Sequence, residues 1–143
     1  MSESCSVFQP TSQDELAAFV ATNTTSNRHP LIPIGGGTTS PKCSAENAIE
    51  VHLDQLNRVI DFPARDMTIT VEAGIRMADL AKILKGENQR LPIDSPQADL
   101  ATLGGVIASN WSGPRRYGCG TMRDYVIGIS AIDATGRQFK AGG

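Results

Sequence analysis

The sequence has few aromatic residues, no strong excess of charge of either sign and no long apolar run. Aromatic residues make up 5% of the 143 residues, and the formal net charge at pH 7 is -2. The basic residues form no extended run, which argues against a nucleic-acid partner. No apolar stretch is long enough for a membrane-spanning helix, and the polar N-terminus lacks the order of a secretory signal. We therefore expect a cytoplasmic protein with no membrane-spanning segment.

Cysteine and histidine are also scarce. The three cysteines, Cys5, Cys43 and Cys119, are widely spaced and include no CxxC pair. This number and spacing predict neither a disulfide framework nor a zinc site, so we expect reduced thiols. His29 and His52 are accompanied by no metal-ligand or nucleophile pattern, and we expect both to be structural. No metal site is predicted.

The first part of the chain has the pattern of a small α/β layer in a single domain. Residues 12–25 place apolar side chains at helical spacing behind Ser12 or Asp14 as N-cap, with Glu15 completing a capping box, and the helix should end near Asn23. Residues 29–35 and 48–53 are short apolar runs typical of buried parallel strands.

The second part predicts further strands and one clear helix. Residues 67–74 alternate as a half-buried strand does, and 103–108 form a short apolar strand among turns. Residues 76–89 predict an amphipathic helix with Gly86 as C-cap, whose buried face is Met77, Leu80, Ala81 and Leu84. Residues 126–136 and 137–143 form a hairpin with no later strand to cover it. We expect an α+β fold of α/β layers, cut off at its C-terminus.

Two glycine clusters carry the functional signal. Gly35, Gly36 and Gly37 follow an apolar strand and precede three hydroxyl side chains. Successive N–H groups without Cβ atoms bind phosphate oxygens well, although a glycine run also suits a simple tight turn. The loop is neither a Walker loop, because Pro41 precedes Lys42, nor a Rossmann fingerprint, because Ser40 stands in place of the third glycine.

The second cluster lies in residues 101–118. Gly104 and Gly105 allow close approach of a ligand to the backbone, and Asn110, Ser112 and Gly113 supply polar contacts and a turn behind the apolar piece. Two glycine-lined loops on one small domain predict an extended ligand with polar and flat parts.

Five motifs in order resemble a known family. "IPIGGGTTS", "TITVEAGIRMADLAKIL", "LPIDSP", "ATLGGVIASNWSGP" and "MRDYVIGISAIDATGR" are similar to the FAD-binding (PCMH-type) domain of the vanillyl-alcohol oxidase / p-cresol methylhydroxylase superfamily of FAD-linked oxidases. Within it, residues 112–136 look most like the FAD-binding subunits of the glycolate oxidase type. The resemblance implies two α/β subdomains, about 8–60 and about 66–143, the second incomplete, with FAD between them.

The resemblance also implies which residues hold FAD. The first pyrophosphate loop would be Gly35, Gly36, Gly37, Thr38 and Thr39. The second loop, along pyrophosphate and isoalloxazine, would be Pro96, Ala101, Thr102, Gly104 and Gly105, with Asn110, Ser112 and Gly113 in the turn behind it. Ile127 and Gly128 would lie against the adenine side. Many relatives join a histidine of the first loop to the flavin; the threonines here, and the absence of cysteine from "LPIDSP", imply non-covalent FAD.

The activity implied is oxidation of a 2-hydroxy acid such as glycolate, with hydride transfer to the flavin. A cap domain or other oxidase subunits would supply the substrate side, so no catalytic residue is assigned and the isolated chain is expected to be inactive. The alternatives are a truncated, non-catalytic flavin-binding module and a domain for another diphosphate ligand such as a nucleotide sugar.

Charged and aromatic residues near the second loop have open roles. Arg115, Arg116 and Arg123 either face the pyrophosphate or a carboxylate, or are solvated. Packing at a turn is expected for Trp111 and Tyr117 rather than contact with the flavin. Asp94 is expected to form a turn rather than to act as a base.

Overall fold

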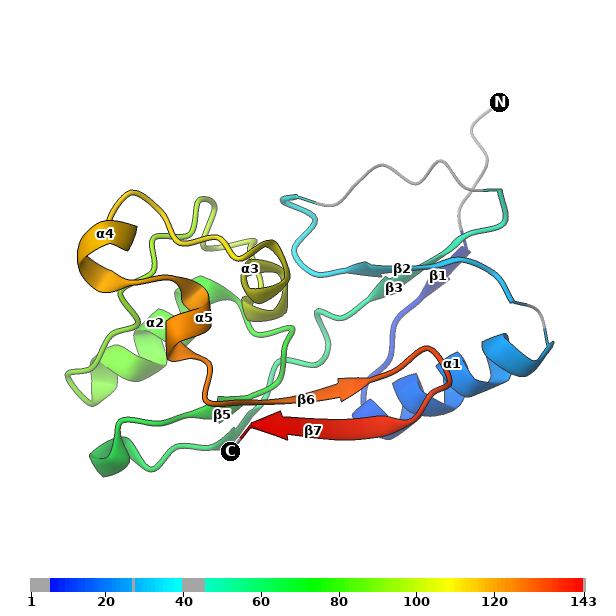
Figure 1. Ribbon diagram of the computed structural model, residues 1–143, viewed down its shortest axis with the longest axis horizontal. Helices are drawn as coiled ribbons and strands as arrows, with labels where there is room; N and C mark the ends of the chain where they lie inside the picture. Colours follow the sequence, from blue (N-terminus) through cyan, green and yellow to red (C-terminus); the bar gives the residue numbers. More distant parts are fainter. Residues whose placement is uncertain (1–5, 27, 40–45, 143) are drawn as a thin grey trace.

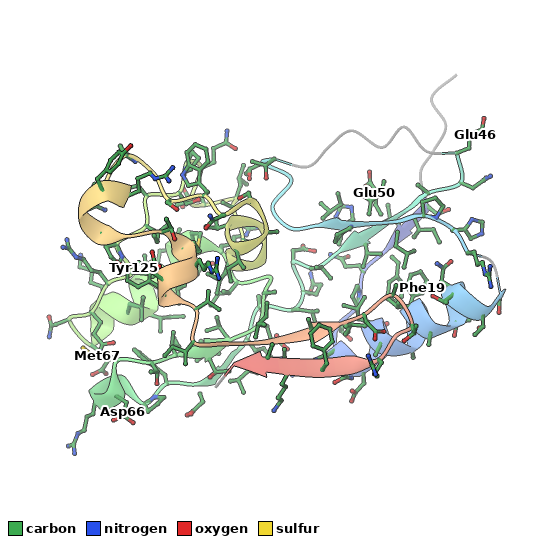
Figure 2. All side chains as sticks on the ribbon, viewed as in Figure 1. Phe19, Glu46, Glu50, Asp66, Met67 and Tyr125 are labelled. Carbon is green, nitrogen blue, oxygen red and sulfur yellow. The ribbon has the colours of Figure 1, made fainter. Side chains whose placement is uncertain are left out.

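The N-terminal part is a small parallel sheet covered by one helix. The computed structural model describes residues 6–26, 28–39 and 46–142 (Figure 1). Strands β1 (Ser6–Phe8) and β2 (Leu31–Ile34) both pair in parallel with β3 (Ile49–His52), in the order β1-β3-β2. Phe8 of β1 stacks on Phe19 of helix α1 (Gln13–Ser26; Figure 2), with ring centroids 3.8 Å apart. The two predicted parallel strands are confirmed; β1 was not predicted, because three residues are too few to show a period.

Helix α1 begins as predicted but ends later. The Ser12 hydroxyl accepts a hydrogen bond from the N–H of Glu15 at 3.2 Å, and the Glu15 carboxylate accepts one from the N–H of Thr11 at 2.8 Å. The helix runs to Ser26, past the expected end at Asn23. The buried Asn23 amide instead bonds both the N–H and the carbonyl oxygen of His29. These two hydrogen bonds fix the backbone of His29 and thereby the segment that leads from α1 into β2.

The segment between the sheet and α2 forms a short antiparallel pair. Strand β4 (Val59–Asp61) pairs with β5 (Thr70–Val71), and a 3-10 turn at Ala64–Asp66 lies between them. The strand predicted over 67–74 is therefore mostly wrong. Met67 has a φ of +55° and closes the 3-10 turn at the periphery (Figure 2), so it cannot continue a strand.

Helix α2 (Met77–Gly86) confirms the predicted helix with two corrections. Met77, Leu80 and Leu84 are buried as expected. Ala81 is exposed, and Ile83 packs against the core instead. Gly86 lies within the helix, whose C-cap is Glu87.

Residues 103–108 form a helix, not a strand. Helix α3 (Leu103–Ser109) starts at Thr102, whose hydroxyl accepts from the N–H of Gly105 at 3.3 Å, and it ends at Asn110 in the left-handed region. The cap residues on both sides decide the conformation, because a six-residue apolar run alone does not distinguish strand from helix. Two short helices, α4 (Arg116–Cys119) and α5 (Met122–Tyr125), follow in the region predicted as turns.

The C-terminal hairpin is confirmed and lies against the first helix. Strand β6 (Gly128–Ile132) pairs antiparallel with β7 (Gln138–Gly142). The Thr24 hydroxyl of α1 donates to the carbonyl oxygen of Ala134 in the turn. Gly136, with a φ of +83°, lies so close that a Cβ there would stand 2.6 Å from the Ala17 carbonyl oxygen. The turn between β6 and β7 thus packs against α1 (Figure 1).

Two clusters of buried residues hold the second half together. One contains Ile75, Leu80 and Leu84, and the other consists of Met77, Ile93, Ala101, Val106 and Met122. Helix α2 contributes to both, and Leu103 packs against both. The second glycine loop therefore packs on the core formed by these buried residues. Within the described ranges, none of the helices combines the length and apolar character needed to cross a membrane.

The β6–β7 turn should make stability depend on pH. Hydrogen bonds from the Thr135 hydroxyl and N–H, and from Arg137, lower the pKa of Asp133 from 3.8 to about 2. Because the folded-state pKa is depressed, the stabilisation is complete above the ordinary pKa and is lost as pH falls through about 2. We expect the melting temperature of the Asp133→Asn variant to fall less steeply than that of the unaltered chain between pH 4 and pH 2. Identical slopes in thermal melts would contradict this role of Asp133.

Candidate functional site

The two glycine loops meet in one pocket of about 270 Å³. The loop after β2 lies beside α3 (Figure 1), so segments far apart in the sequence face one another. Nine of the predicted cofactor-binding residues line this pocket: Gly35, Gly36, Gly37, Thr38, Thr39, Pro96, Ala101, Thr102 and Gly105. The structure thus brings the first loop and most of the second loop to a common surface.

The first two glycines make room for the second loop. A Cβ on Gly36 would overlap the carbonyl group of Leu100, and a Cβ on Gly35 would overlap the hydroxyl of Thr102. Thr102 is 2% exposed and caps α3, so it has no space to withdraw. The absence of side chains at Gly35 and Gly36 therefore lets two stretches of backbone pack directly against each other.

The rest of the first loop is open to the pocket. Gly37 has a φ of +69° with open space where a Cβ would stand. None of the backbone hydrogen bonds formed outside helices and strands in the described parts of the chain starts at an N–H group of residues 35–39. These N–H groups and the hydroxyls of Thr38 and Thr39 can therefore donate to an anionic ligand, as in other concave phosphate-binding loops.

The second loop is fixed by backbone hydrogen bonds to the β5–α2 turn. The carbonyl oxygen of Ala101 accepts from Met77 N–H at 2.9 Å, and Gly104 N–H donates to the carbonyl oxygen of Ala73 at 2.7 Å. A Cβ on Gly104 would stand 2.9 Å from the Cβ of Ala73. Gly104 thus packs against the turn and does not line the pocket, unlike Gly105.

The remaining predicted residues lie outside the pocket wall. Asn110 ends α3, and Ser112 is buried with its hydroxyl accepting from Met122 N–H at 3.3 Å. Gly113 has a φ of +72° beside Asp94. Ile127 is 68% exposed, and Gly128 is the first residue of β6. Their assignment to FAD remains a prediction.

Trp111 lines the pocket, although from the sequence it is expected to pack at a turn. Its side chain lines the pocket, is 44% exposed, and donates from Nε1 to the carbonyl oxygen of Asp94 at 2.8 Å. Tyr117, by contrast, is 98% exposed, so the expectation that it packs at a turn is wrong. The guanidinium of Arg116 lies 5.9 Å from its ring centroid.

Arg115 has a defined partner. Its Nε donates to Asp94 Oδ2 at 2.6 Å, and its Nη2 donates to Oδ1. This hydrogen bonding from Arg115 lowers the pKa of Asp94 and raises that of Arg115. The ion pair shows that Asp94 does more than shape a turn.

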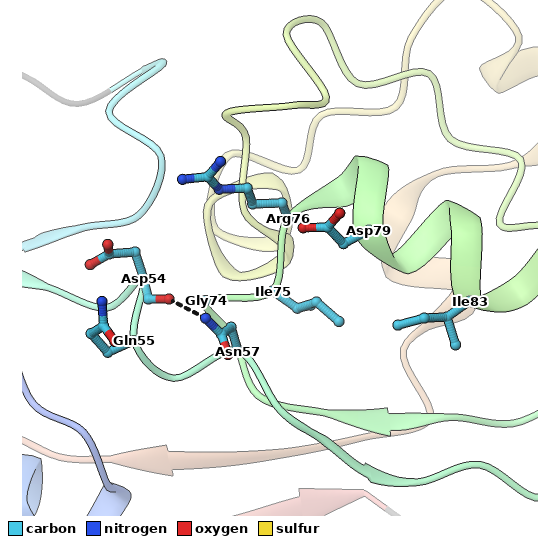
Figure 3. A pocket seen from close by; sticks show the side chains of 8 residues that line it. All are labelled: Asp54, Gln55, Asn57, Gly74, Ile75, Arg76, Asp79 and Ile83. Atoms are coloured by element: carbon cyan, nitrogen blue, oxygen red, sulfur yellow. Dashed lines mark hydrogen bonds between the residues drawn. The ribbon is translucent and has the colours of Figure 1, made fainter.

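A second pocket, of about 380 Å³, lies at the start of α2 (Figure 3). Three of its polar groups have protein partners: Asp54 accepts from Gln9, the carbonyl oxygen of Asp54 accepts from Asn57, and Asp79 pairs with Lys82. None of the predicted cofactor-binding residues lines this pocket. No group of three or more potential metal ligands occurs among the described residues. The pocket between the two glycine loops is therefore the stronger candidate.

The family model for the FAD binding domain matches residues 6–142. The chain belongs to this family, and the resemblance identified from the five motifs is confirmed. Its described helices and strands agree with the mixed fold expected.

Curated relatives and a solved structure are consistent with this membership. The glycolate oxidase subunit GlcD of Bacillus subtilis (strain 168) is 28% identical over 96% of this chain and 29% of its own length. The D-lactate dehydrogenase of Anaerostipes hadrus is 29% identical over 94% of this chain and 28% of its own length. An alkyldihydroxyacetonephosphate synthase structure superimposes with a TM-score of 0.82 at 24% identity, covering 94% of this chain and 26% of that one, which supports the fold. The chain spans less than a third of these relatives.

Proposed function

We propose that the pocket between the two glycine loops binds FAD without a covalent bond. The observation that carries the proposal is the meeting of these loops around N–H groups that make no backbone hydrogen bond to any described residue. The diphosphate would lie against residues 35–39, and the flat ring system would lie along the second loop. Among the described residues, the pocket wall contains no histidine or cysteine that could form a covalent link to the flavin. Cys43 lies outside the described residues.

We further propose that the chain is the FAD-binding component of a cytoplasmic oxidoreductase acting on a 2-hydroxy acid such as glycolate. Relatives named for glycolate, D-lactate and D-2-hydroxyglutarate support this substrate class. Bound FAD would supply the hydride acceptor, and this chain would hold and orient it. The catalytic side chains and the contacts to the hydroxy acid belong to a cap domain or another subunit.

We propose a division into subdomains at about 8–60 and 66–143, with FAD between them. The first glycine loop follows β2 of the parallel sheet, and the second belongs to the part organised around α2 and α3. A ligand that contacts both loops would hold the two parts together.

An absorbance spectrum from 300 to 550 nm, taken before and after acid precipitation, tests the FAD proposal. We expect flavin bands in the purified or FAD-reconstituted chain that pass into the supernatant after precipitation. Flavin that stays with the pellet would contradict the non-covalent mode. A chain that binds UDP-glucose but not FAD in an ultrafiltration assay would instead favour a nucleotide-sugar domain.

Bleaching of the flavin by a hydroxy acid tests the activity separately. Glycolate and D-lactate should reduce the flavin in the complete enzyme, assembled with its substrate-binding part, and should not do so in the isolated chain. Absence of bleaching in the complete enzyme would contradict the substrate class while leaving FAD binding intact.

A further inference from the structure

The segment after α3 makes several contacts to a single residue, Asp94, which lies just before the second loop. Asp94 receives two hydrogen bonds from the guanidinium of Arg115, and its carbonyl oxygen receives one from Trp111 Nε1 at 2.8 Å. Between these two residues, a Cβ on Gly113 would stand 2.9 Å from the Cβ of Asp94. We call Asp94, Trp111, Gly113 and Arg115 the Asp94 clamp.

The clamp joins two walls of the candidate pocket. Ser95 and Pro96, immediately after Asp94, line one part of it, and the Trp111 side chain lines another. Asp94 and Arg115 themselves do not line the pocket. A bidentate Arg–carboxylate pair has a defined geometry, so the clamp sets how the two walls stand relative to each other.

The bond from Trp111 also fixes the orientation of its ring. The only polar atom of an indole is Nε1–H, and here it is engaged by Asp94, while the side chain remains 44% exposed at the pocket. A half-exposed aromatic ring held by one edge is suited to stacking against a planar ligand group.

We propose that Trp111 stacks on a ring system of the bound ligand and that the Asp94–Arg115 pair is the positioning device that holds it there. The inference rests on the proposed function for the identity of the ligand and adds the residue that recognises its flat part. Arg115 acts through Asp94 and Trp111, and it is a positioning residue.

Trp111 is the only tryptophan in the sequence, so its fluorescence reports directly on the pocket. Titration with FAD, corrected for absorption with free N-acetyltryptophanamide, should quench the emission with the same saturation curve as FAD retention in ultrafiltration. Trp111→Phe should keep the affinity within a few-fold, and Trp111→Ala should weaken it about tenfold or more. FAD retained without quenching of Trp111 would overturn the stacking role and leave FAD binding intact.

The clamp is tested by Asp94→Asn, Arg115→Met and their combination. Each single variant should weaken FAD binding, make Trp111 more accessible to acrylamide and leave the melting temperature nearly unchanged, because exposed ion pairs add little stability. The double variant should bind FAD no more weakly than either single variant, because both substitutions remove the same interaction. Asp79→Asn, which breaks the exposed pair with Lys82, is the matched control and should change none of these three readouts.

The outcomes separate the two proposals. If ultrafiltration shows no FAD retention, the FAD proposal fails, and the same titration with UDP-glucose decides the stacking role. Quenching then supports Trp111 as a ring-binding residue, and the absence of quenching by either probe overturns it. Acrylamide quenching that is equal in all clamp variants without ligand would overturn the positioning role of Arg115 independently of any ligand.

Discussion

The Gly36→Ala variant is expected to lose FAD binding and to melt at a lower temperature than the unaltered chain. The added methyl group would overlap the carbonyl group of Leu100. Because the obstacle is backbone rather than a flexible side chain, the two loops must move apart. The N–H groups of residues 35–39 then no longer face the second loop across the same pocket. The loss of binding would thus follow from a clash with the neighbouring loop rather than from a side chain in the ligand's place.

Gly86→Ala is the matched control for this variant. Gly86 lies in the last turn of α2, with no atom within 4 Å of where its Cβ would stand. The substitution should leave FAD binding unchanged and stabilise the chain by up to about 1 kcal/mol, because alanine favours helix more than glycine does. A flavin fluorescence titration and a thermal melt measure both effects. Unchanged affinity in Gly36→Ala would show that the two loops need not touch for binding.

The Leu80→Ala variant should destabilise the fold by about 2–5 kcal/mol, a cost typical of removing a buried leucine side chain. Leu80 is 2% exposed and packs in the cluster with Ile75 and Leu84, against which Leu103 of α3 also rests. A domain of ordinary stability has about 5–15 kcal/mol in total, so much of it would be lost. Urea denaturation measures the loss through the midpoint at constant slope.

Saturating FAD should recover part of this stability, since a ligand that binds only the folded state stabilises it by mass action. Lys82→Ala, two residues further along α2, loses only the exposed pair with Asp79 and should change the free energy of unfolding by less than about 0.5 kcal/mol. An equally small change in Leu80→Ala would show that α2 is not a main support of the second loop.

Regular elements with a clear period were predictable, and short ones were not. The strands at 29–35 and 48–53, the helix at 76–89 and the C-terminal hairpin correspond to β2, β3, α2 and β6–β7. Strands β1 and β4 have three residues each, which is too short to show alternation. Helix α3 was not predicted, because its apolar run fits either a strand or a helix. The signals that distinguish the two are the cap residues Thr102 and Asn110.

The loops that form the candidate site could be predicted from the sequence, but the contacts between them could not. Glycine runs indicate where backbone needs space, yet they do not say what fills it. That Leu100 faces Gly36 depends on how α2 and α3 pack, which no local pattern encodes. Likewise, Asp94 and Arg115 are 21 residues apart, and only the folded chain shows that the pair is held beside the pocket through Trp111.

The backbone construction of the pocket has a consequence for how such a site tolerates sequence change. Most of its proposed ligand contacts come from main-chain groups, which every amino acid carries. Substitutions at Thr38 or Thr39 should therefore have little effect on ligand binding. At Gly35 and Gly36 even alanine should be disruptive, because its methyl group would clash with a neighbouring residue. A mutational scan of this region should therefore give two separate populations of variants, nearly neutral ones and complete losses, with few intermediates.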